Sequence, residues 1–148
     1  MLSQRAKYAL KAMIALASDR GPQPLSVTDI AKRANVPRAF LEQILSDLKR
    51  RNLLISTRGA RGGFRLARLP QDISFADIIR HIDGPLALAP CVSPRLGFRK
   101  CADCPDLLTC TLRQALLRAR DATADVLEGY TLADAAASGE AEGVTPAA

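Results

Sequence analysis

Four cysteines fall within one short stretch of the chain: Cys91, Cys101, Cys104 and Cys110. Thiolates are the usual protein ligands of iron–sulfur clusters, they bind zinc, and paired thiols exchange with disulfides. Cysteines clustered in a cytosolic protein indicate a metal or redox site rather than structural disulfides. The sequence therefore predicts a thiol centre in this stretch.

The residues alone leave three kinds of thiol centre open. Four thiolates suffice for tetrahedral zinc, although the interval from Cys91 to Cys101 is longer than a usual ligand pair. Cys101 and Cys104 form a Cys-x-x-Cys pair that suits a disulfide switch. The third kind is an iron–sulfur cluster. The only histidine, His81, lies among isoleucines and is expected to be an ordinary helix residue rather than a ligand.

The two halves of the chain differ in charge. Residues 1–70 carry 14 Lys and Arg against 4 Asp and Glu, a net charge of +10, whereas residues 71–148 carry 7 against 11, a net charge of −4. Basic charge gathered on one half indicates that this half contacts a polyanion.

The basic half has the pattern of a helix-turn-helix. Apolar residues at three- and four-residue intervals predict a helix over residues 3–18. A second helix is predicted from Ser26, with Asp29 in a capping box, to about Ala34. A third follows Pro37, and its predicted buried face comprises Phe40, Leu41, Ile44, Leu45 and Leu48.

The first two turns of the third helix are the predicted DNA-reading element, because the N-terminal residues of a recognition helix reach base edges. They carry Arg38, Ala39, Glu42 and Gln43. Glu42 suits a cytosine amino group, and Gln43 or Arg38 suits a purine. The alternative is that Glu42 is only the i,i+4 ion-pair partner of Arg38.

A basic hairpin is predicted directly after this helix. Strand-like residues 54–58 and 64–66 flank a glycine-rich tip, and Arg58, Arg61 and Arg65 crowd upon it. A phosphate-binding loop is not indicated, since no Lys-Ser/Thr pair follows the glycines and the next residues form a strand. The hairpin is either a DNA-contacting wing or a purely structural one.

The acidic half contains a predicted capped helix from Ser74 to about Asp83, a loop, and a long helix over residues 107–128. Apolar residues in heptad register along the long helix predict a homodimer seam, or else a face that docks on the chain's own core. These residues are Leu108, Leu112, Ala115, Ala119, Ala122 and Val126.

The predicted fold class is mainly α with a small β-hairpin wing: a winged helix-turn-helix plus a long dimerisation helix. Four regions are expected: the DNA-binding domain (1–83), the cysteine loop (84–106), the dimerisation helix with a short terminal turn over 131–137 (107–137), and a flexible tail (138–148). No secretory signal or apolar run of about 20 residues is present, so a cytoplasmic protein is expected. No nucleotide fingerprint or acid–base constellation indicates an enzyme or an electron carrier.

Several of these segments together resemble a known family. Residues 40–45, residues 53–59, the Gly-Gly-Phe-Arg-Leu wing at 62–66 and the later cysteines are similar to the winged-helix iron–sulfur regulators, the "Rrf-two" family that includes IscR, NsrR and RirA. The resemblance covers about residues 1–130. It implies a homodimer with crossed long helices, a 2Fe-2S or 4Fe-4S cluster, base discrimination by Glu42 and entry of Arg58 into the minor groove.

The resemblance also implies a ligand set. Three cysteines bind the cluster in the family, and they match Cys91, Cys104 and Cys110, whereas Cys101 is additional. IscR-like members have a histidine ligand where Arg113 stands, and arginine is not a normal ligand. The fourth ligand is therefore Cys101, a partner residue or a small molecule. Ala39 stands where IscR-like proteins can carry a serine that reads the operator, so the operator sequence is not transferable.

The expected function is that of a dimeric DNA-binding transcription regulator of promoter operators, controlled by an iron–sulfur cluster that senses iron, redox or nitric-oxide status. The alternative is a cluster-free repressor that responds to thiol oxidation or is stabilised by zinc.

Overall fold

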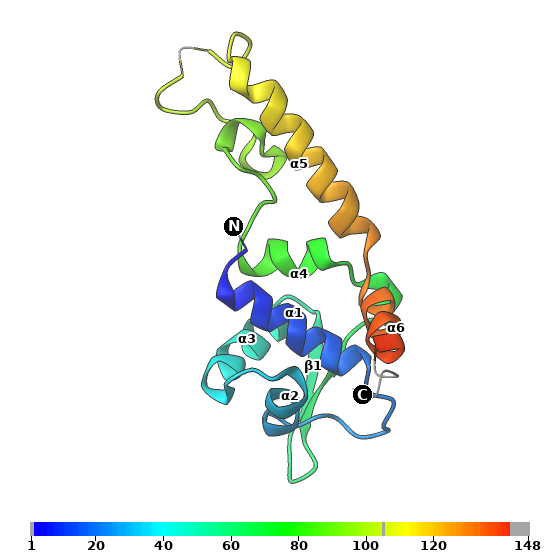
Figure 1. Cartoon of the computed structure of the whole chain (residues 1–148). Coiled ribbons are helices and arrows are strands. Elements are labelled where there is room, and N and C mark those ends of the chain that lie inside the picture. The colour runs from blue at the N-terminus through cyan, green and yellow to red at the C-terminus, as the bar shows by residue number, and fades with distance from the viewer. Residues whose placement is uncertain (1, 105, 143–148) are drawn as a thin grey trace.

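The computed structural model describes residues 2–104 and 106–142. This part of the chain is mostly helical with one β-hairpin (Figure 1). In chain order its elements are α1 (Gln4–Ala17), α2 (Val27–Ala34), α3 (Arg38–Arg50), β1 (Leu54–Thr57), β2 (Gly63–Leu66), η1 (Pro70–Asp72), α4 (Phe75–Ile82), η2 (Pro90–Val92), η3 (Pro94–Leu96), α5 (Thr111–Gly129) and α6 (Leu132–Glu142). The predicted mainly α fold with a hairpin wing is confirmed.

Local signals begin and end the helices of the helix-turn-helix. Ser26 and Asp29 form the predicted capping box at the start of α2, which satisfies backbone N–H groups that have no partner within the helix. Asn35 ends α2 in the left-handed region, with φ 50°, and the chain turns into α3 at Pro37. The turn brings α2 and α3 together beneath α1.

The core of this domain lies between α1, α3 and the start of β1. Met13, Leu41, Leu45 and Leu48 are all fully buried there, as the helical periodicity predicts. The prediction that Phe40 belongs to the buried face is wrong, because its side chain is 57% exposed. Phe40 precedes the buried stripe by one residue and instead packs its ring against Tyr8 of α1, with ring centroids 5.7 Å apart.

The wing is an antiparallel pair in which Leu54 faces Leu66 and Thr57 faces Gly63. Its tip turns at Gly59, whose φ of +110° few other residues adopt. The base of the wing is tied to the segment before α2, since Phe64 donates its N–H to the Leu25 carbonyl at 2.8 Å and accepts the Leu25 N–H at 3.1 Å. The hairpin is therefore anchored at its base while its tip projects from the domain (Figure 1).

After α4 the chain leaves the winged domain. It forms the cysteine-containing loop and returns along α5, so that this loop and the tip of the wing lie at opposite ends of the molecule (Figure 1). The structure begins α5 at Thr111, four residues later than predicted, because Asp106 accepts the N–H of Leu108 in a turn before the helix. The C-terminal part of α5 packs on α4, where Arg80 pairs with Glu128.

The terminal helix is longer than the sequence predicts. Thr131 and Asp134 cap its start, and α6 continues to Glu142 rather than ending after one short turn. Residues 138–142, expected in the flexible tail, are helical, and residues 143–148 lie outside the described residues. Leu132 is fully buried, and its N–H donates to the Ile73 carbonyl at 3.0 Å, so α6 docks on the N-terminal domain.

Within the described ranges, no helix is long and apolar enough to cross a membrane.

Gly63 allows the wing to approach the strand-like segment before α2. A Cβ atom at this position would overlap the carbonyl oxygen of Leu25. We expect Gly63→Ala to lower the free energy of unfolding by about 1–3 kcal/mol, the usual cost of overpacking. Gly129→Ala is the control, because nothing lies within 4 Å of its added Cβ. Chemical denaturation measures both, and equal stability of the two variants would contradict this account of the wing.

Candidate functional site

The predicted DNA-reading residues of α3 all lie on its exposed surface. The side chains of Arg38 and Glu42 are 64% and 62% exposed, and Ala39 and Gln43 are exposed beside them. Arg38 Nε lies 3.5 Å from Glu42 Oε1, so the i,i+4 ion pair weighed in the sequence is present. An exposed pair of this kind contributes little to stability, and both side chains remain accessible to a ligand.

The carboxylate of Asp47 joins several side chains on the outer face of α3. Gln43 donates to Asp47 at 3.1 Å, and Asp47 also pairs with Arg5 of α1 and with Arg50. Asp47 is the only acidic partner of these side chains among the described contacts. The amide of Gln43 is thus directed along the helix toward Asp47.

The wing carries its positive charge without internal partners. Arg58, Arg61 and Arg65 are exposed, and none of them forms an ion pair with the residues that the structure describes. Cations on a projecting hairpin next to a helix-turn-helix suit phosphates or the minor groove of DNA.

The four predicted thiols gather around the beginning of α5. Cys91 is buried in η2, and Cys110 is the N-cap residue of α5. Between them Cys101 and Cys104 stand in a turn closed by the hydrogen bond from the Cys104 N–H to the Cys101 carbonyl, 3.3 Å long. Cys104 Sγ lies 3.9 Å from Cys110 Sγ, and all four cysteines are free.

The protonated forms of Cys91 and Cys104 are favoured in the metal-free protein. Burial raises the pKa of Cys91, with a further contribution from its hydrogen bond with Cys101. The hydrogen bond with Cys110, and then burial, raise the pKa of Cys104 to about 11. A metal that binds here must displace protons, so metal affinity will rise with pH.

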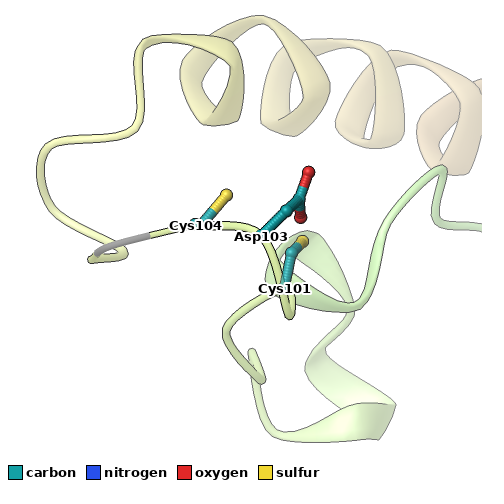
Figure 2. Close-up of side chains that lie close together, drawn as sticks. All are labelled: Cys101, Asp103 and Cys104. Atoms are coloured by element: carbon teal, nitrogen blue, oxygen red, sulfur yellow. The ribbon is translucent and has the colours of Figure 1, made fainter.

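Sequence reasoning missed one member of the cluster, Asp103. Its carboxylate and the sulfurs of Cys101 and Cys104 all lie within 4.8 Å of one another, and Figure 2 shows the three side chains on the same turn. In the sequence Asp103 lies inside the Cys-x-x-Cys pair, but only the fold shows that its carboxylate is close to both sulfurs.

The arrangement suits a metal with thiolate ligands. Two thiolates on one tetrahedral metal ion, each about 2.3 Å from it, stand about 3.8 Å apart. The observed separation of Cys104 and Cys110 is close to this value. The turn and the N-cap of α5, with Cys91 of η2 beside them, therefore supply the thiolate ligands that an iron–sulfur cluster or a zinc ion requires.

A family model and curated relatives place this chain in the same family. A family model, Rrf2, described as an iron-dependent transcriptional regulator, matches residues 2–138. A putative HTH-type transcriptional regulator, rrf2-like, of Rhodobacter capsulatus is 38% identical over 142 residues, which cover 94% of each chain. The chain belongs to the Rrf2 family.

Solved structures of Rrf2-type proteins share the fold of this chain. CymR, the global cysteine regulator of B. subtilis, matches with a TM-score of 0.76 at 33% identity, over 93% of this chain and 97% of that chain. IscR of T. potens matches with a TM-score of 0.74 at 28% identity, over 100% and 93% respectively. Rrf2 proteins are transcription regulators that bind DNA through a winged helix, not enzymes.

Arg113 has a role in this Rrf2 chain that spacing alone did not indicate. It stands in the first turn of α5, where its Nε donates to the carbonyl of Cys91 at 3.2 Å. Its guanidinium also lies 6.0 Å from the centroid of the Phe98 ring. Arg113 therefore fastens η2, with Cys91, to the helix that begins at Cys110.

Removing this hydrogen bond is expected to expose the buried thiol. In the metal-free protein, Arg113→Met should raise the alkylation rate of Cys91 several-fold, while Arg118→Met, an exposed arginine of the same helix, should leave it unchanged. Peptide mass mapping after timed alkylation gives the rate for each cysteine. If Cys91 reacted equally fast in both variants, Arg113 would have no part in positioning it.

Proposed function

We propose that this Rrf2 protein is a dimeric regulator whose affinity for a promoter operator is set by an iron–sulfur cluster on Cys91, Cys101, Cys104 and Cys110. The observation that carries the proposal is the convergence of four free thiols at the N-terminal end of α5. Such a cluster would be assembled or lost as iron, oxidant or nitric-oxide levels change.

The exposed seam of α5 supports the dimer. The side chains of Leu108, Leu112 and Val126 are 89%, 70% and 69% exposed, and the alanines of the predicted seam are exposed as well. The chain's own core therefore does not cover this face, which leaves a second copy as the best partner for it. Leu108 precedes the helix and would extend the seam from the turn before it.

A continuous set of contacts leads from the thiols to the DNA-binding domain. Arg113 joins Cys91 to the first turn of α5, and the last turn of α5 pairs Glu128 with Arg80 of α4. Beyond α5, α6 packs on α1. A change at the thiol loop can thus alter how α5 sits on the winged domain. Because two recognition helices must fit successive major grooves, a small change in their spacing alters DNA affinity.

In this proposal the exposed residues of α3 and the wing form the DNA interface. Arg38, Ala39, Glu42 and Gln43 face base edges, and Arg58 and Arg61 contact phosphates or the minor groove. The Arg38–Glu42 pair then orients both side chains before DNA is bound, and it opens where either side chain contacts a base.

A cluster-free thiol or zinc regulator is the second candidate. It is favoured by the likeness to CymR, the global cysteine regulator of B. subtilis, and by the tight grouping of Cys101, Asp103 and Cys104. The two candidates differ in whether iron and sulfide are needed for DNA-affinity control.

Loss of a thiol from the centre is expected to abolish the control of DNA affinity. The probe is a duplex selected from a random-sequence library with wild-type protein. We expect the Kd of wild-type protein to differ about tenfold or more between the cluster-loaded and cluster-free forms, and Cys104→Ser to show no difference after the same loading treatment. Anaerobic fluorescence anisotropy measures the Kd.

Thr109→Ala, an exposed neighbour of Cys110, serves as the matched control and should behave as wild type. Equal DNA affinity of the loaded and cluster-free wild-type protein would contradict cluster control, while leaving DNA binding itself intact.

The wing is expected to contribute phosphate contacts. Arg58→Ala should weaken binding to the same duplex and reduce the slope of log Kd against log salt concentration by about one phosphate equivalent. Arg99→Ala, which removes an exposed arginine of the cysteine loop, should leave affinity and slope unchanged. An unaltered slope in Arg58→Ala would remove this residue from the DNA interface.

A further inference from the structure

The closest group of metal-binding side chains in the described part of the chain is not made of thiols alone. Cys101, Asp103 and Cys104 have ligand atoms that all lie within 4.8 Å of one another, and neither Cys91 nor Cys110 joins the group at that spacing. A carboxylate, rather than a third thiol, therefore completes the tightest triad.

The backbone holds these three side chains together. The hydrogen bond from the Cys104 N–H to the Cys101 carbonyl closes the turn that contains Asp103. In Figure 2 the side chains of Cys101, Asp103 and Cys104 come from the same stretch of chain. Within the described contacts the Asp103 carboxylate accepts no hydrogen bond and forms no ion pair, so it is available as a ligand. A fourth donor is near, because Cys110 Sγ lies 3.9 Å from Cys104 Sγ.

We propose that Asp103 is a metal ligand, and that Cys101, Asp103 and Cys104, joined by Cys110, bind a single divalent zinc or ferrous ion. Zinc and ferrous ions accept both thiolate and carboxylate ligands, whereas calcium and magnesium prefer oxygen alone. Three thiolates and one carboxylate supply the four ligands of a tetrahedral site. Binding releases the thiol protons to solvent and involves no oxidation or reduction.

This site occupies the same loop as the proposed cluster, but it does not depend on the cluster. In this site the loop holds one metal ion when no cluster is assembled. Cys91, buried in η2, does not join the group of ligand atoms that lie within 4.8 Å of one another, so it stays outside the site. The same thiols can then hold a cluster or a single ion, and Asp103 serves only the latter.

The test uses anaerobically reduced, metal-free full-length protein. Cobalt(II) is the spectroscopic probe, since the intensity of thiolate-to-cobalt charge transfer counts the thiolate ligands. Zinc affinity is then measured by competition with a chromophoric chelator. Wild-type protein should show the intensity of three thiolates, and Cys91→Ser should show the same spectrum. An intensity that requires four thiolates would overturn the proposal.

Three variants at or near the turn isolate the carboxylate. Asp103→Asn should weaken zinc binding by at least about tenfold, since loss of even an outer-shell partner typically costs about 10- to 100-fold. Asp106→Asn is the matched control in the same loop and should keep wild-type affinity, because an amide oxygen can still accept the Leu108 N–H. Asp103→Cys should raise the charge-transfer intensity by one thiolate.

Each outcome is decisive. Equal zinc affinity of the wild type and Asp103→Asn would overturn the proposal. So would a weakened Asp103→Asn together with an unchanged charge-transfer intensity in Asp103→Cys, because Asp103 would then act by charge and not as a ligand. Cluster reconstitution of Asp103→Asn separates the two proposals. A normal cluster with normal zinc affinity would contradict only the role of Asp103, whereas failure of wild-type protein to assemble any cluster would contradict only the proposed function.

Discussion

The packing of α5 links the cysteine loop to the winged domain. Polar contacts fasten this helix to its own chain near both ends, through Arg113 and η2 at the beginning and through Glu128 and α4 at the end. Between these ends its apolar seam is exposed. A helix of 19 residues with an uncovered seam is stable only if it is packed against another surface. Cys110 is the N-cap of this helix, so the thiol centre adjoins the element that the proposed dimer buries.

Under the proposed function, this arrangement lets sensing and DNA binding lie far apart in one small chain. The thiol loop and the wing are at opposite ends of the molecule (Figure 1), and no direct contact between them is needed. In the proposed dimer, α5 sets the relative placement of two winged domains, and both α4 and α6 attach it to the domain of its own chain. Under the proposed function, a metal-dependent change at Cys110 acts on the spacing of two recognition helices rather than on either helix alone.

The parts of the fold that sequence predicted are those specified by neighbouring residues. The capping boxes at Ser26 and Ser74, the turn at Asn35 and the glycine-rich wing tip are local features, and each lies where its residue types indicate. The features that were missed depend on contacts distant in sequence. Phe40 lies outside the buried core and packs against Tyr8. The helix α6 is long because Leu132 docks beside Ile73, and Arg113 binds a carbonyl 22 residues away. Asp103 was overlooked because a lone aspartate among cysteines has no distinctive spacing, and only the folded turn brings it to the sulfurs.

Metal analysis of the purified protein tests whether the four thiols hold an iron–sulfur cluster. Protein purified without oxygen is examined by visible absorption, and its iron, acid-labile sulfide and zinc are counted per chain. We expect visible absorption, iron and sulfide in matched amounts, and little zinc. A colourless protein that contains stoichiometric zinc or no metal, even after anaerobic reconstitution with iron and sulfide, would contradict this expectation.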